Sequence, residues 1–96
     1  MEVRPFTIAV ADNVLDDLRQ RLADTRWPDE IPNSGWDYGS NLSYVRELVE
    51  YWRTDFDWRA QEAKLNAFNH FKSEVDGLDI HFIHEKGKGP NPIPLI

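Results

Sequence analysis

The chain has 96 residues, of which 41% are hydrophobic and 29% charged, and it carries a formal net charge of -6. This length allows one small domain, the composition excludes intrinsic disorder, and the negative charge makes nucleic acid and anionic membrane surfaces unfavourable partners. The sequence has no cysteine for a disulfide or a Cys-based zinc site, no apolar run near the roughly 20 residues that cross a bilayer, and no secretory start, so we expect a cytoplasmic protein.

The N-terminal part of the chain predicts an extended arm followed by a helix. Apolar and smaller side chains alternate over residues 5–10, which indicates an extended segment with one covered side. A helix is expected to follow, capped by Asp12 or Asn13 and ending near Asp24. Its apolar residues fall at helical spacing: Val14, Leu15, Leu18 and Leu22. Pro28 then enforces a break, because the residue before a proline is disfavoured in the helical region.

A loop is expected after this helix and extends through Gly39. Trp27, Trp36 and Tyr38 are large apolar side chains within it, so we expect the loop to be held against other structure. The alternative function for these aromatic side chains is to form a cage around a ligand. It has less support, because the loop lacks the convergent polar groups that a binding pocket needs.

Two further helices are expected in the middle of the chain. The first begins at Ser40 or Asn41 and runs to about Thr54, with an apolar face wide enough to touch two neighbours. The second follows Asp57 as its cap and runs from Trp58 to about Ala67. Arginines flank the link between the two helices and are expected to pair with carboxylates nearby: Arg53 and Arg59, with Asp55, Asp57 or Glu62.

The period changes from helical to two at Phe71, and Asp76-Gly77 predicts a two-residue hairpin turn. Pairing across this turn gives an apolar face with the pairs Val75–Leu78, Ser73–Ile80 and Phe71–Phe82. The opposite face has the pairs Glu74–Asp79 and Lys72–His81. A polar loop over residues 85–92 leads to Ile93–Ile96, which we interpret as the first residues of a buried strand whose continuation is missing.

The three histidines do not predict a metal site or a catalytic base. His81 and His84 are three apart on a strand and therefore point to opposite faces, and His70 lies just before the first strand. Structural hydrogen bonding is the expected role of each. The sequence has no phosphate-binding glycine loop, nucleophile elbow or zinc motif, so we expect no catalytic, cofactor-binding or metal-binding residue in this chain.

The chain contains a series of distinctive motifs. In chain order they are Thr25-Arg26-Trp27-Pro28, Trp36-Asp37-Tyr38-Gly39, Phe56-Asp57-Trp58-Arg59, His70-Phe71, and Asp76-Gly77 followed by Ile80-His81-Phe82-Ile83-His84. In order and spacing they resemble the N-terminal region of microsomal-type epoxide hydrolases, and the resemblance covers the chain from Arg4 to Ile96. In that family this region precedes an α/β-hydrolase domain, wraps over it and its lid, and contributes the first strands of its sheet.

The resemblance implies an α+β fold with about three helices followed by a β-hairpin that supplies the first strands of an α/β-hydrolase sheet and is incomplete alone. Residues 1–70 would form a helical wrapping segment with an extended arm. Residues 71–96 would form the hairpin and the start of the next strand, where the hydrolase core begins. A His-Gly oxyanion-hole motif should follow that strand.

The family's reaction opens an epoxide to a vicinal diol without a cofactor, through an ester on an aspartate nucleophile. The working residues would lie beyond Ile96, so the 96 residues alone are expected to be inactive. Tyr38, Tyr44 and Tyr51 fall in the wrapping segment and do not match the lid tyrosines, and none of the histidines matches the base.

Two functions from different classes follow from the sequence. In the first, the chain is a scaffold whose partner is the catalytic α/β-hydrolase domain, on the same or a separate chain, and the small epoxide binds only to the whole enzyme. In the second, the chain is a free-standing interaction module without enzymatic activity, such as a homodimer formed through its tryptophan-rich surface and an unpaired strand.

Overall fold

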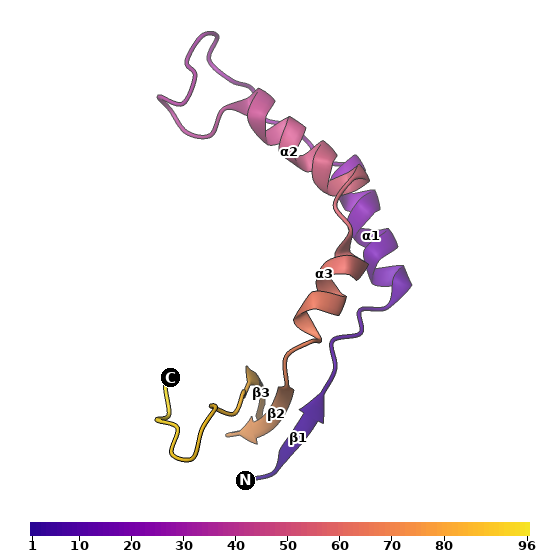
Figure 1. Ribbon diagram of the computed structural model, residues 1–96. Helices are drawn as coiled ribbons and strands as arrows, with labels where there is room; N and C mark the ends of the chain where they lie inside the picture. The colour runs from indigo at the N-terminus through magenta and orange to yellow at the C-terminus, as the bar shows by residue number, and fades with distance from the viewer. The chain divides into compact units, whose positions relative to one another are not determined.

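The computed structural model describes residues 1–96, which form three helices and a three-stranded antiparallel sheet, in agreement with the expected mixture of helix and strand (Figure 1). The elements in chain order are β1 (Val3–Phe6), α1 (Asp12–Ala23), α2 (Leu42–Thr54), α3 (Trp58–Leu65), β2 (His70–Val75) and β3 (Leu78–Ile83). The contacts divide the chain into two compact units. We call Met1–Ala9 with Trp58–Ile96 the sheet unit, and Val10–Asp57 the helical unit.

In the helical unit, α1 begins one residue earlier than the sequence predicts. Its N-cap is Ala11, in an extended conformation and without a side-chain cap hydrogen bond, so the prediction of Asp12 or Asn13 as the cap is wrong. Asp12 instead lies in the first turn, where a carboxylate is favoured by the helix dipole. At the other end, the Thr25 hydroxyl donates to the Leu22 carbonyl at 2.8 Å and helps to close the helix before Pro28.

The start and the end of α2 agree with the sequence prediction. Asn41 caps the helix, because its side-chain oxygen accepts a hydrogen bond from the Tyr44 backbone N–H at 3.0 Å. The loop before α2 is held by two aromatic contacts, since Trp36 lies against Tyr44 with ring centroids 5.4 Å apart and the Arg46 guanidinium lies 5.5 Å from the Trp27 ring centroid. Tyr38 is 80% exposed, so the expectation that it is covered is wrong.

In the sheet unit, β2 lies between β1 and β3, and both pairings are antiparallel (Figure 1). The β2–β3 register has all five of the pairs expected across the turn. Asp76 and Gly77 have positive φ angles of 51° and 79°, which are the angles of a type I′ hairpin turn. The N-terminal arm is more than an extended segment, because its residues 3–6 pair with β2 and Phe6 lies opposite His70.

Asn66 joins the arm to the end of α3. Its amide nitrogen donates to the Ile8 carbonyl at 2.8 Å, and its side-chain oxygen accepts from the Ile8 backbone N–H at 2.9 Å. Because Ile8 lies beyond the end of β1, these bonds satisfy backbone groups that have no strand partner. The helix itself ends at Leu65, two residues before the expected Ala67.

The ion pairs predicted for the two arginines near the α2–α3 link are confirmed for one arginine and wrong for the other. Arg59 binds Glu62 at 2.9 Å, one of the partners expected from the sequence. Arg53 binds Glu50 through two bonds of 2.6 and 2.9 Å, so the prediction that it pairs with a carboxylate of the link is wrong. Glu50 precedes Arg53 by three positions on the same helix, which places the two side chains on neighbouring turns.

The last residues of the chain have no strand partner. Ile93 and Leu95 are almost fully exposed, and no residue after Ile83 belongs to the sheet. A strand needs a neighbouring strand to bond its backbone N–H and C=O groups. The strand predicted to begin at Ile93–Ile96 stays a prediction. The predicted division of the chain at residue 70, into a wrapping segment and the start of the hydrolase core, also stays a prediction. The contacts within the chain divide it differently and group α3 and the N-terminal arm with the hairpin.

Candidate docking surface

The chain buries very little apolar surface of its own. Leu15, which is 8% exposed, is the only buried hydrophobic side chain, and the other two buried residues are His70 and Ser73. Hydrophobic burial is the main favourable term in folding, so a chain of this composition ordinarily covers more of its leucine, isoleucine and aromatic side chains. The uncovered apolar side chains are therefore the first candidates for a functional surface.

One face of the sheet is apolar and largely open. Because side chains alternate across a strand, the paired residues of the three strands place one set on this side, which we call the apolar sheet face: Val3, Phe71, Val75, Leu78, Ile80 and Phe82. Phe71 and Phe82 stack with ring centroids 5.8 Å apart. Leu78 is 66% exposed, and Val75 and Ile80 are each 45% exposed. This face has the composition of a sheet surface that lies against other protein.

The sheet also has open edges. Its strand order is β1-β2-β3, so β3 pairs on one side only. An unpaired edge presents a row of backbone N–H and C=O groups that can bond to a further strand. Two features of β3, its open edge and its exposed Leu78 and Ile80, therefore suit the addition of another strand.

The helical unit has a second open apolar surface, on α2. We call it the aromatic helix face. It consists of Tyr44, Leu48, Tyr51 and Trp52 of α2, together with Trp36 of the preceding loop, which lies against Tyr44. Tyr44, Leu48 and Tyr51 are spaced by four and three residues, so they lie along one side of the helix, and each is about half exposed. The sequence predicts two neighbours for α2, and within its unit α1 is the only helix that contacts it.

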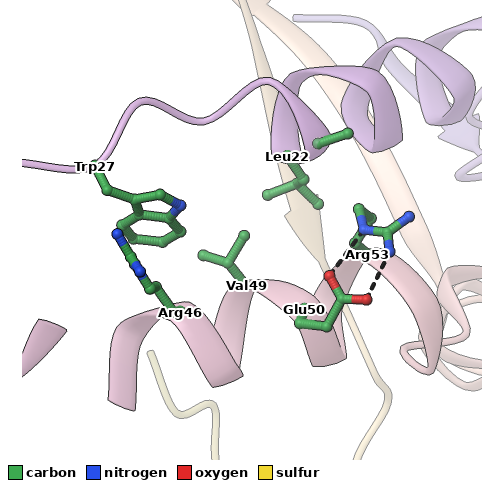
Figure 2. Close-up of a pocket in the computed structure, with 7 residues that line it drawn as sticks. Leu22, Trp27, Arg46, Val49, Glu50 and Arg53 are labelled. Atoms are coloured by element: carbon green, nitrogen blue, oxygen red, sulfur yellow. Dashed lines mark hydrogen bonds and ion pairs between the residues drawn. The ribbon is translucent and has the colours of Figure 1, made fainter. Parts of the chain in front are cut away.

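Figure 2 shows a groove between the end of α1, Trp27 and α2. Arg46, Val49, Glu50 and Arg53 line it from one side of α2. Two of its polar side chains bind each other, because Arg53 donates to both oxygens of Glu50, and Arg46 lies over the Trp27 ring. This arrangement connects the loop to the helix and supplies no convergent free polar groups in the groove. The ligand cage considered from the sequence concerns the loop with Trp27, Trp36 and Tyr38, of which only Trp27 lines this groove, and it stays a prediction.

The Glu50–Arg53 pair gives a prediction for pH dependence. The hydrogen bond from Arg53 lowers the pKa of Glu50 below its ordinary value of 4.5. A carboxyl group with a lowered pKa stabilises the folded chain above the ordinary pKa, and this contribution is lost as the pH falls through the folded value. We expect an NMR titration of the Glu50 carboxyl carbon to have a midpoint below 4.5 and to move upward in Arg53→Gln. Arg46→Gln on the same helix is the control, and equal midpoints in both variants would contradict the assignment.

Two of the three histidines, His70 and His81, contact each other, and His84 lies on the other face of the sheet. The His84 ring lies 6.4 Å from that of Phe71, on the apolar sheet face, whereas the His81 ring lies 4.8 Å from that of Phe6 on the opposite side. Groups of three or more metal-ligating side chains do not occur. The expected hydrogen bonding is confirmed for His70, which is 5% exposed and bonds to the Leu65 carbonyl and to His81.

Sequence reasoning missed the His70–His81 contact, although the signal was present. The hairpin register places His81 opposite Lys72, and His70 lies two residues from Lys72 on the same face. Diagonal neighbours on a sheet are within reach of long or aromatic side chains.

None of the three helices is long and apolar enough to span a membrane.

Comparison with known proteins gives a consistent result over almost the whole chain. The family model described as "Epoxide hydrolase N terminus" matches residues 3–96. Epoxide hydrolase 1 of Oryctolagus cuniculus is 39% identical over 100 residues, which cover 98% of this chain and 22% of that protein. This chain spans about a fifth of the length of the curated relatives that it matches.

Two solved structures are similar to the chain as well. Juvenile hormone epoxide hydrolase of Bombyx mori has a TM-score of 0.82 and 27% identity, over 93% of this chain and 24% of that one. The Aspergillus niger epoxide hydrolase has a TM-score of 0.77 and 34% identity, over 86% of this chain and 22% of that one.

Proposed function

The chain belongs to the epoxide hydrolase N-terminus family, and from this we propose that it is the N-terminal scaffold region of an enzyme that hydrolyses epoxides to vicinal diols. The match over residues 3–96 is the observation that carries the proposal. The scaffold covers and orders a catalytic α/β-hydrolase domain. Its partner is that domain, and the small epoxide binds only to the complete enzyme.

The apolar sheet face and the open edge of β3 are the contacts we assign to the hydrolase domain. In this arrangement β2 and β3 are the first strands of the hydrolase sheet, and a strand of the catalytic domain bonds to the free edge of β3. Complete burial of a leucine or isoleucine side chain contributes about 1.5–3 kcal/mol, so covering half-exposed side chains contributes roughly 1 kcal/mol each. Burial of Leu78 and Ile80 would therefore add to the backbone hydrogen bonds of the edge.

The aromatic helix face is a second contact surface in this proposal. Tyr44, Tyr51 and Trp52 combine large apolar area with polar tips, which is typical of side chains at protein interfaces. Covering them would give α2 the second neighbour that its wide apolar face predicts. We assign this face to the wrapping contact over the hydrolase domain.

The chemistry is assigned to the catalytic domain. An aspartate oxygen there attacks one epoxide carbon, the ring C–O bond breaks, and the ring oxygen takes a proton from a lid tyrosine of that domain. Water then hydrolyses the ester, which releases the diol, restores the aspartate carboxylate and returns one proton to the tyrosine. The scaffold contributes no catalytic, cofactor-binding or metal-binding residue. Several of its charged groups bind one another, as in the Arg4–Asp79 pair at 2.8 Å and the Glu50–Arg53 pair.

The direct test is complementation in trans. The 96-residue chain is mixed with the hydrolase domain of the Aspergillus niger enzyme produced without its own N-terminal segment, and styrene oxide hydrolysis is measured. We expect the chain to bind and to raise hydrolysis at least tenfold. Ile80→Lys should abolish this gain, because it places a charge on the apolar sheet face, whereas Lys88→Glu in the polar loop should leave it unchanged.

The rival function, a homodimerisation module, is favoured by the same open β3 edge, which a second copy of the chain could pair with. Analytical ultracentrifugation separates the two functions. A stable symmetric dimer that neither binds the hydrolase domain nor raises its activity would overturn the scaffold proposal and support the module.

A further inference from the structure

The two edges of the three-stranded sheet differ in the backbone groups that they present. β2 lies in the middle, so β1 forms one edge and β3 the other. In an antiparallel sheet the N–H and C=O of a residue bond to the same neighbouring strand, and the direction alternates from one residue to the next. The register therefore decides which residues bond within the sheet and which face outward at each edge.

One bond just beyond the hairpin sets this alternation for β2 and β3. The His84 N–H donates to the Asn69 carbonyl at 3.0 Å. His70 lies opposite Ile83, so the preceding Asn69 and the following His84 lie opposite each other and form a hydrogen-bonded pair. The residues of β3 that face outward are then Asp79, His81 and Ile83. The β3 edge presents the N–H and the C=O of each of these residues to a further strand.

The outer edge of β1 is interrupted by a proline. The same alternation makes two of the β1–β2 pairs hydrogen-bonded: Arg4–Lys72 and Phe6–His70. The residues of β1 that face outward are therefore Val3 and Pro5. Because proline has no backbone N–H, Val3 is the only residue of β1 that offers a donor to a further strand.

The inner side of the same segment is bonded at both of its ends. Beyond β1, the N–H and C=O of Ile8 bond to the Asn66 side chain at 2.9 and 2.8 Å. Before β1, the Glu2 carbonyl accepts a hydrogen bond from the Ser73 hydroxyl at 2.8 Å. Proline is compatible with an edge strand where its nitrogen faces away from the neighbouring strand, and Pro5 occupies such a position.

We propose that Pro5 blocks strand addition at β1, so that the sheet accepts a partner strand only at β3. A strand laid along β1 would bury a carbonyl opposite Pro5 without a donor, which weakens association by roughly 10- to 100-fold. Two copies of the chain would then pair only through β3, and pairing would stop at two copies because a blocked β1 lies at each outer edge. The proposal depends on the register and does not require the proposed function.

Analytical ultracentrifugation of chains that carry Ile83→Pro, which removes an outward donor from β3, tests the block at β1. Adding Pro5→Thr supplies the missing outward N–H through a polar residue that favours strands. We expect this double variant to dimerise with a dissociation constant lower by about tenfold or more than that of Ile83→Pro alone. Pro92→Thr added to Ile83→Pro is the matched control, because it makes the same exchange outside the sheet, and it should leave the dissociation constant unchanged.

Hydrogen exchange of the backbone amides, followed by ¹⁵N NMR, identifies the edge that associates. Dimerisation of the Pro5→Thr double variant should slow exchange at Val3 and at position 5, and should not slow it at Asp79 or His81. Pro5→Val is measured in parallel, and circular dichroism checks that both variants keep the sheet.

Four results would each overturn the proposal. The first is a chain with Ile83→Pro alone that already pairs through β1. The second is a pair of Pro5 variants that associate no more strongly than Ile83→Pro alone, and the third is association without slowed exchange at β1. The fourth is loss of the sheet in both variants, because Pro5 would then be required to form β1 itself.

Discussion

Replacement of Leu15 by alanine is expected to lower the free energy of unfolding of the helical unit by about 2–5 kcal/mol. Leu15 is the only hydrophobic side chain that the chain buries, so no other buried leucine or isoleucine shares its contribution. Removal of its terminal carbon atoms loses transfer free energy and leaves a cavity beside α1. Urea denaturation followed by circular dichroism of the helices measures the change.

The neighbouring Val14→Ala is the matched control for Leu15→Ala. Val14 lies on the same turn of α1 but is 53% exposed, so its truncation removes little buried area. We expect a change within about 0.5 kcal/mol for this variant, as is usual for surface positions. Equal losses for the two variants would show that Leu15 is not the packing centre of the helical unit.

Replacement of Ile83 by proline is expected to weaken binding to the hydrolase domain by about 10- to 100-fold and to leave the hairpin intact. The His84 backbone N–H bonds to the Asn69 carbonyl at 3.0 Å, and inward and outward N–H groups alternate along an antiparallel strand. The N–H of Ile83 therefore points to the open edge of β3. Proline lacks this donor, and an added strand would keep an unsatisfied carbonyl that costs about 1–3 kcal/mol.

Ile83→Ala is the control for the proline variant, because it also loses the isoleucine side chain but keeps the outward N–H. Isothermal titration of each variant with the truncated Aspergillus niger hydrolase domain gives the affinities. Circular dichroism checks that the β2–β3 hairpin is retained, since proline is tolerated at an outward position of an edge strand. Equal affinities for the two variants would show that no strand is added at this edge, and the contact assigned to β3 in the scaffold proposal would fail.

The features that the sequence predicts best are those that depend on neighbouring residues. Asn41 caps α2 through a backbone N–H only three residues away, and Asp76-Gly77 takes the positive φ angles that set the hairpin register. The predicted cap of α1 is wrong by one residue, because Ala11 takes the cap conformation without a side-chain hydrogen bond. The Asp and Asn residues at this position therefore indicate that a helix begins here but do not define its first residue.

The candidate docking surface was predicted only in part. The alternation in the hairpin shows which residues share the apolar sheet face, and the spacing on α2 shows the aromatic helix face. How far they are covered cannot be predicted from spacing, since Tyr38 was expected to be held and is 80% exposed. Exposure depends on whether another segment of the chain reaches the side chain, and local pattern does not contain that information.

The sequence by itself determined the order of the three helices and the hairpin, the hairpin turn and its register, and the membership of the chain in its family. Only the tertiary structure decided that residues 3–6 are a strand, that Asn66 holds Ile8, and that His70 binds His81. Helix caps and two-residue turns are set by hydrogen bonds within a few residues. The pairing of Phe6 with His70 joins positions that are distant in the chain, and such contacts form only when the remaining elements bring their partners together.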